Sequence, residues 1–151
     1  MAAKRKGGKE KLGGLRGRID RVDRELHALL NERARLAREV GISKSKAGDL
    51  VDFYRPEREA EVLRLALERN AELRGKGGLR DEEIARLFRE IMSACLALEA
   101  PQTIAFLGPQ GTFTQAAALK HFGHAAVSRP MATIDEVFRE VEAGSAHYGV
   151  V

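Results

Sequence analysis

Three cations stand where a helical core normally places apolar residues. Between Leu12 and Lys44, every third or fourth residue forms one continuous stripe, the spacing of a long helix that packs against other helices. Arg16, Arg33 and Lys44 lie on that stripe. A buried cation without a counter-charge is very costly, so three along one stripe favour an anionic ligand held between helices. The alternative is that each side chain extends to water at the edge of the bundle.

Cys95 and Glu99 lie four residues apart in a later helical pattern and therefore share one side of that helix. Two interpretations stay open for each residue. Cys95 is by default a small core residue, as most buried free cysteines are. Glu99 is either part of a site or the first exposed residue beyond the core.

The net charge of the chain is concentrated at its beginning. Residues 1–12 hold five cationic side chains against Glu10 alone, which accounts for the whole formal charge of +4. The remainder is neutral and lacks a basic face with interleaved aromatic residues, so we expect no nucleic-acid partner. Residues 1–11, rich in Lys and Gly, are expected to form a disordered basic tail. With 44% apolar but only 5% aromatic residues, the core must be built from aliphatic side chains.

The composition of the 151 residues also limits compartment and cofactors. Cys95 is the single cysteine, which excludes an intramolecular disulfide and fits a reducing, cytoplasmic compartment. No run of about 18 apolar residues occurs, so no membrane span is expected. The histidines have no metal-ligand spacing, and we expect neither a metal nor a cofactor. These residues are His27, His121, His124 and His147.

Three helical patterns occupy residues 12–100, separated by turn-forming residues at 47–49 and by a Gly-rich stretch at 75–78. Pro56 suits the first position of the second helix, because its missing N–H would have no intrahelical partner there. Asp81 is expected to cap the third helix. The sequence thus predicts a mainly α region of three helices.

The character of the sequence changes after Pro101. Three short β-type runs alternate with two helical patterns, at residues 103–107, 116–122, 127–131, 134–141 and 148–151. This alternation predicts a βαβαβ segment. Its Gly-rich first turn, residues 108–112, would present backbone N–H groups to an anion, although such a stretch is often only a turn. The pattern ends on a strand, which indicates truncation.

The first helical pattern resembles the first helix of the all-α chorismate mutases, which reads L-R-x-x-I-D-x-x-D-x-x-L-x-x-L-L-x-x-R-x-x-L-A-x-x-V-G-x-x-K. Residues from Leu15 to Lys44 fill every fixed position of it. The P-E-R-E run at residues 56–59 is similar to that family's entry to the second helix. Over residues 12–100, the resemblance implies a three-helix domain that forms an intertwined homodimer. Each active site would borrow one residue from the partner chain.

The resemblance also implies a reaction. These enzymes rearrange chorismate, a dicarboxylate, to prephenate in one pericyclic step that needs no nucleophile, metal or proton transfer. Catalysis is therefore positioning and electrostatic stabilisation. By position, Arg33 and, from the partner chain, Arg16 would hold the carboxylates, because a guanidinium fork matches a carboxylate. Lys44 and Glu99 would approach the breaking ether oxygen from two sides.

The ring hydroxyl of the substrate would be bound at the start of the second helix. Glu59 would accept its hydrogen bond, with Arg58 beside it. Three positions depart from the family pattern. Arg55 stands where many relatives have Asp, which leaves the hydroxyl to Glu59. Cys95 stands where some have Ser, which weakens a polar contact to a carboxylate, and Glu99 replaces the neutral Gln of some members.

Residues 101–151 resemble the opening of the prephenate dehydratases, on the run T-I-A-F-L-G-P-Q-G-T-F-T-Q-A-A. The Thr-Arg-Phe motif that carries that family's chemistry does not occur, and neither does its regulatory phenylalanine-binding domain. The resemblance therefore implies a mutase followed by an incomplete dehydratase segment without dehydratase activity. Mutase followed by dehydratase is the order found in bifunctional enzymes of bacterial phenylalanine biosynthesis.

A non-catalytic function is the alternative hypothesis. The same long helix fits a non-catalytic helical dimerisation module whose basic tail docks on an acidic partner. Replacing Arg33 by Leu separates the two, because a dimerisation helix would gain stability from a buried leucine. A mutase would lose its activity instead.

Overall fold

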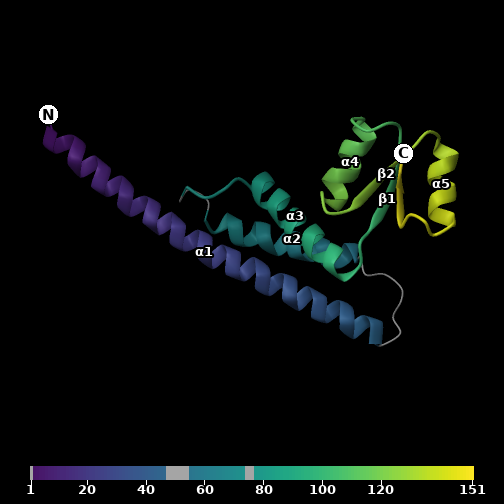
Figure 1. Cartoon of the computed structure of the whole chain (residues 1–151), viewed down its shortest axis with the longest axis horizontal. Helices are drawn as coiled ribbons and strands as arrows, with labels where there is room; N and C mark the ends of the chain where they lie inside the picture. Colours follow the sequence, from purple (N-terminus) through teal and green to yellow (C-terminus); the bar gives the residue numbers. More distant parts are fainter. Residues whose placement is uncertain (1, 47–54, 74–76) are drawn as a thin grey trace. The chain divides into compact units, whose positions relative to one another are not determined.

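The computed structural model describes residues 2–46, 55–73 and 77–151 (Figure 1). The chain divides into two compact units, Met1–Leu36 and Ala37–Val151. The turn expected at residues 47–49 lies outside the described residues, as do residues 75 and 76 of the Gly-rich stretch. Within the described part the chain is mainly helical, with five helices and one small sheet, as the sequence predicted.

The first helix, α1, spans Ala2–Lys46. Its end agrees with the sequence prediction, but its beginning does not, because a disordered tail was expected over residues 1–11. Ala, Lys, Arg and Glu are strong helix formers, and they make up most of that segment. Extending an existing helix adds one hydrogen bond per residue without a new nucleation cost. The strongly helical residues that follow can therefore carry the helix back to Ala2.

One face of α1 carries apolar side chains that are exposed in the single chain. Within residues 12–36, seven large aliphatic side chains have exposed fractions between 45% and 63%. They are Leu12, Leu15, Ile19, Val22, Leu26, Leu29 and Leu36. An apolar strip of this length is unusual on the surface of a monomeric protein.

The helices α2 (Pro56–Ala71) and α3 (Asp81–Glu99) pack against each other. Pro56 occupies the first turn of α2, as predicted. Asn70, buried near the end of α2, donates to the backbone carbonyl of Leu79 at 3.0 Å and to Asp81 Oδ1 at 2.7 Å. Asp81 was expected to cap α3, but Arg80 holds the cap position and the Asp81 carboxylate accepts from Asn70. That bond ties the two helices together.

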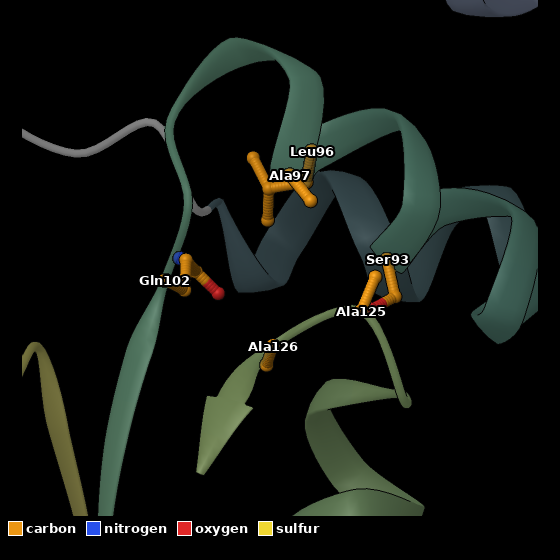
Figure 2. A pocket seen from close by; sticks show the side chains of 6 residues that line it. All are labelled: Ser93, Leu96, Ala97, Gln102, Ala125 and Ala126. Atoms are coloured by element: carbon orange, nitrogen blue, oxygen red, sulfur yellow. The ribbon is translucent and has the colours of Figure 1, made fainter.

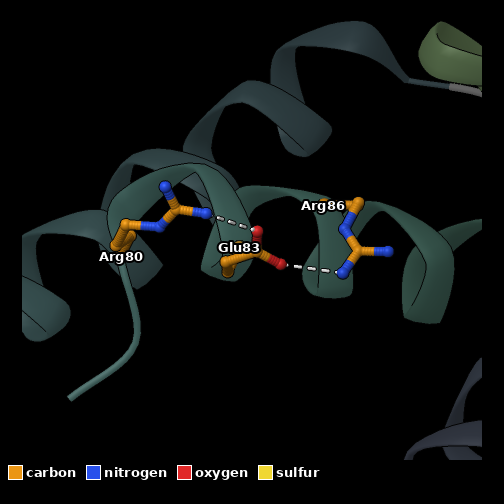
Figure 3. Close-up of polar contacts among 3 residues, drawn as sticks. All are labelled: Arg80, Glu83 and Arg86. Carbon is orange, nitrogen blue, oxygen red and sulfur yellow. Dashed lines mark hydrogen bonds and ion pairs between the residues drawn. The ribbon is translucent and has the colours of Figure 1, made fainter.

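The first turn of α3 holds an exposed three-residue ion network (Figure 3). Glu83 accepts from Arg80 at 3.1 Å and from Arg86 at 2.7 Å. The hydrogen bond and charge of Arg86, followed by those of Arg80, lower the pKa of Glu83. Because the network is exposed, its contribution to folding is small. The Arg86 guanidinium is therefore already paired with Glu83.

The C-terminal segment is a three-stranded parallel sheet with two helices. Its strands are β1 (Thr103–Leu107), β2 (Val127–Met131) and β3 (Tyr148–Val150), and its helices are α4 (Phe113–Phe122) and α5 (Ile134–Glu142). The strand order is β2-β1-β3, which confirms the βαβαβ prediction. Right-handed crossovers in this order place α4 and α5 on opposite faces of the sheet, as Figure 1 shows. The central strand β1 is therefore the most buried, with Ala105 and Phe106 fully buried.

The turn after α4 contacts α3 and thereby joins the helical region to the sheet. Gly123 has a φ of +79°, and a Cβ placed on it would lie 2.4 Å from Ser93 Cβ. Glycine is therefore required both by the backbone and by the close approach. A cavity of about 10 Å³ lies beside this contact (Figure 2). It is lined by Ser93, Leu96, Ala97, Gln102, Ala125 and Ala126.

Glu90, on α3, binds the turn that follows α4. Its two carboxylate oxygens meet the His124 backbone N–H at 3.1 Å and His124 Nδ1 at 2.7 Å. Burial raises the pKa of Glu90, but the hydrogen bonds and charge of His124, together with the charge of Arg86, outweigh it and lower that pKa overall. A carboxyl whose pKa is lowered on folding stabilises the fold above its unfolded pKa and loses that contribution as the pH falls through its folded pKa.

We therefore expect Glu90→Gln to lower the melting temperature at neutral pH by more than it does in acid. The difference from the parent chain should shrink as the pH falls below about 4.5, the ordinary Glu value. Thermal unfolding followed by circular dichroism at several pH values checks this. Glu82→Gln removes an exposed carboxylate from the same helix and is the matched control. A Glu90→Gln effect that is equal at all pH values would contradict the charged clamp.

Candidate active site

The ends of α1 and α3 bring Lys44 and Glu99 together. Lys44 Nζ lies 3.8 Å from Glu99 Oε2, and the exposed fractions of the two side chains are 22% and 12%. Glu99 is therefore not the first solvent-exposed residue beyond the core, which was one of the two interpretations left open. Lys44 likewise faces a carboxylate. The two residues that the resemblance assigned to the ether oxygen are adjacent in the structure.

Gly41 allows α1 to approach Glu99 this closely. It is buried, and a Cβ placed on it would lie 3.3 Å from Glu99 Cβ and 3.4 Å from Glu99 Cα. These distances are tighter than ordinary van der Waals contacts, so an alanine would push the start of the Glu99 side chain away by a few tenths of an ångström. Gly41 lies one turn before Lys44, so this contact fixes the spacing of the Lys44–Glu99 pair.

Glu59, in the first turn of α2, faces α3 rather than solvent. Its Oε1 lies 3.5 Å from Arg89 Nε, and the exposed fractions of the Glu59 and Arg89 side chains are 17% and 28%. Arg89 Nε is buried and makes no hydrogen bond in the described part of the chain. Sequence reasoning missed Arg89, since it is off the apolar stripe of α3 and 30 residues from Glu59. Only the packing of α2 on α3 reveals the contact.

The other predicted residues of this region are placed differently. Arg58 forms an exposed ion pair with Glu61, one turn along α2. Arg55 is exposed at the cap position of α2 and makes no side-chain cap hydrogen bond. Cys95 is buried, 6% exposed, and free. The guanidinium that accompanies Glu59 is therefore that of Arg89, where the sequence had placed Arg58.

Arg16 and Arg33 both belong to the first compact unit and both lie on α1. Arg16 is exposed and Arg33 partly exposed. At a rise of 1.5 Å per residue, the 17 residues between them correspond to roughly 25 Å along the helix axis. A single small dicarboxylate cannot bridge that length. The two arginines of one chain therefore cannot hold the same substrate molecule.

Several backbone N–H groups of the Gly-rich turn before α4 donate within the C-terminal segment itself. The Gly111 backbone N–H donates to Gln115 Oε1 at 2.6 Å, and the Gln115 backbone N–H donates to Thr112 Oγ1 at 3.3 Å. Side chains of the same segment thus accept from Gly111 in the turn and from Gln115 in the first turn of α4. In addition, Gly108 donates to the carbonyl of Met131 at 2.8 Å. These hydrogen bonds cap α4 and join the turn to the end of β2.

A larger cavity of about 600 Å³ lies between α3 and α4. It is lined by Glu82, Arg86, Arg89, Glu90, Ala116, Leu119, Lys120 and His124. Its charged groups are largely paired, Arg86 with Glu83 and Glu90 with His124.

Among the described residues, no cluster of three or more His, Cys, Asp or Glu could hold a metal ion. No helix of that part of the chain is long and apolar enough to cross a membrane.

Two known families match this chain, one after the other along the sequence. Residues 15–100 match the family model described as chorismate mutase type II, and residues 104–151 match that of prephenate dehydratase. Most of α1 and all of α2 and α3, with the Lys44–Glu99 pair, fall within the first match. The chain belongs to the chorismate mutase type II family, and its C-terminal part is the beginning of a prephenate dehydratase-type segment. Both resemblances seen in the sequence are confirmed.

Curated relatives have the same order of segments. The chain is 57% identical over 145 residues to a bifunctional chorismate mutase/prephenate dehydratase of Pseudomonas aeruginosa and 58% identical over 146 residues to that of Stutzerimonas stutzeri. It is 34% identical over 154 residues to that of Escherichia coli K12. These matches cover 94%, 94% and 91% of this chain, and the chain spans 38% of the length of each relative. No solved structure matches the chain.

Proposed function

We propose that this chain catalyses the rearrangement of chorismate to prephenate, as the mutase part of a bifunctional enzyme of phenylalanine biosynthesis. The observation that carries the proposal is the Lys44–Glu99 pair, 3.8 Å apart at the junction of α1 and α3 within the matched family segment. In this reaction an ether C–O bond breaks as a C–C bond forms. Negative charge develops on the ether oxygen, and a cation and a hydrogen-bond donor placed on either side of it lower the barrier.

Lys44 supplies the positive charge and Glu99, when protonated, the hydrogen bond. Both side chains are mostly buried, so water does not screen them strongly. The reaction needs no nucleophile, and the free thiol of Cys95 takes no covalent part. Because no proton is consumed, the protein acts by holding the substrate in a compact, chair-like shape and by stabilising charge.

Arg33 holds one substrate carboxylate, and Arg16 of the partner subunit holds the other. The roughly 25 Å that separate these two positions along one helix support this division, because one chain cannot supply both. The exposed apolar face of α1 between Leu12 and Leu36 supports the homodimer that the division requires. Two copies packed antiparallel along these faces would bury the strip and place Arg16 of one chain near Arg33 of the other.

Glu59 accepts the hydrogen bond of the ring hydroxyl. Its position in the first turn of α2, where it is 17% exposed, supports this role. Arg55 and Arg58 are exposed, and their positions give less support to a direct contact with the substrate. Arg55 and Arg58 attract the dianionic substrate from the surface through their positive charges. Cys95, buried on α3, contributes packing and at most a weak contact to a carboxylate.

Disappearance of chorismate, followed by its absorbance on adding the purified chain, tests the proposal. Lys44→Met keeps most of the side-chain volume and removes the charge, so its kcat should fall by about a hundredfold or more. A dimer without mutase activity would point to the alternative, a helical dimerisation module. In that case Lys44→Met would leave every measured property except stability unchanged.

The contact between Gly41 and Glu99 gives a second, finer expectation. Gly41→Ala raises the helix propensity of α1 by roughly 1 kcal/mol and should therefore not destabilise the fold. It should still lower kcat by about tenfold, because it displaces Glu99 by a few tenths of an ångström. Gly13→Ala, at a position where an added Cβ would meet nothing within 4 Å, is the matched control. It should lower neither the stability nor kcat. Equal kcat values for the two variants would show that the contact does not set the geometry.

A further inference from the structure

Arg89, whose side chain is 28% exposed, places a positive charge against Glu59. Its Nε atom is inaccessible to solvent and makes no hydrogen bond within the described residues. The carboxylate oxygen Oε1 of Glu59 lies 3.5 Å from it. This separation is beyond the 2.7–3.2 Å of a good N–H···O hydrogen bond, yet short for two opposite charges in a poorly hydrated place. An Arg side chain is always charged, so it needs this counter-charge.

From this geometry we infer that Arg89 is a positioning residue, which orients Glu59 to receive the hydroxyl group of the substrate. The inference rests on the proposed function and adds a residue to it. A carboxylate has two equivalent oxygens and rotates freely unless one is held. With Oε1 directed toward Arg89, the other oxygen is left to accept from the hydroxyl.

Arg89 also offsets a repulsion that the substrate creates. The substrate brings two carboxylates into a site that already contains the Glu59 carboxylate. Like charges a few ångströms apart destabilise one another, and the mostly buried position of Glu59 gives little screening. A fixed guanidinium next to Glu59 reduces this repulsion without touching the substrate. Its effect should therefore be felt in substrate binding more than in the bond-making step.

The neighbouring arginines Arg58 and Arg86 pair with other carboxylates. Arg58 is adjacent to Glu59 in sequence but is paired with Glu61 on the exposed side of α2. Arg86 lies one turn before Arg89 on α3 and is paired with the exposed Glu83. Arg86 and Arg89 line the same cavity, but the Arg86 side chain is 70% exposed, whereas that of Arg89 is 28% exposed and reaches Glu59. That difference makes Arg86→Gln the matched control for Arg89→Gln.

Steady-state kinetics with chorismate tests the inference. Arg89→Gln should raise KM by about tenfold with kcat within about threefold of the parent, since an interaction made equally in ground and transition states changes KM. Arg89→Lys restores the charge without the planar fork and should recover part of the loss. Arg86→Gln should be within about twofold of the parent in both constants.

A double-mutant cycle distinguishes positioning from a general structural effect. In a Glu59→Gln background, Arg89→Gln should cause no further rise in KM, because the residue on which it acts is no longer a carboxylate. Independent, multiplicative losses would overturn the inference, as would an Arg89→Gln variant with the parent's KM. Circular dichroism and the dimer mass of each variant identify a loss that comes from unfolding, in which case Arg89→Lys carries the test. A parent chain without mutase activity would instead refute the proposed function itself.

Discussion

Arg16→Ala and Arg33→Ala should each lose nearly all mutase activity alone and regain about a quarter of the parent's activity when mixed and allowed to exchange subunits. Random exchange makes half of the dimers hybrid. In a hybrid, one site receives both mutated arginines and the other receives none. One intact site in half of the dimers gives the expected quarter. The quantity to measure is the specific activity of the equilibrated mixture.

The control for this experiment uses two residues that one chain supplies to the same site. Arg33→Ala mixed with Lys44→Ala places one mutation in each of the two sites of every hybrid, so no activity should return. Exchange itself is followed by mass, using one tagged partner. If the first mixture fails to recover activity although hybrids are present, Arg16 does not act across the interface. Recovery in the control mixture would show that Arg33 and Lys44 come from different chains.

Periodicity predicted the helices of this protein well, because it depends only on neighbouring residues along the chain. The stripe through α1 and the alternation after Pro101 both correspond to observed elements. The beginning of α1 was predicted less well, since its Lys- and Gly-rich composition is compatible with a tail and with a helix. Turn chemistry was also underestimated. The N–H of Gly111 is satisfied by Gln115, a residue that the Gly-rich pattern does not include.

Periodic patterns in the sequence could not predict contacts between helices that lie far apart along the chain. The resemblance assigned Lys44 and Glu99 to one site, and the structure places them 3.8 Å apart. It gave no indication of Arg89, because an arginine off the apolar stripe of a helix is normally a solvent-exposed residue. Its contact with Glu59 depends on how α2 and α3 pack. The clamp of Glu90 on His124 was missed for the same reason, since its partners are 34 residues apart.

The mutase should also work better in mild acid than at neutral pH, and Glu99 is the reason. A carboxylate next to the ether oxygen repels the negative charge that develops there, whereas a carboxylic acid donates a hydrogen bond to it. The protonated form is therefore the active one. As the pH rises through the titration of Glu99, in the complex for kcat and in the free enzyme for kcat/KM, each quantity should fall by an amount that reflects the lost hydrogen bond, about tenfold or more.

The surroundings of Glu99 act on this titration in opposite directions. The Lys44 ammonium, 3.8 Å away, favours the carboxylate, whereas burial and the two substrate carboxylates favour the acid. Because the substrate adds negative charge, the acid should be more favoured in the complex than in the free protein. The fall in kcat should therefore occur at higher pH than the fall in kcat/KM, which reports the free enzyme.

Glu99→Gln decides whether this account is correct. The amide donates a hydrogen bond at every pH, so the profile of kcat/KM between about pH 5 and 8 should become flat. At pH 8 the variant should exceed the parent, and at pH 5 the two should be similar. Two superimposable profiles would exclude Glu99 from the reaction. A Glu99→Gln variant that is inactive at all pH values would show that the negative charge of Glu99, acting on Lys44, matters more than its proton.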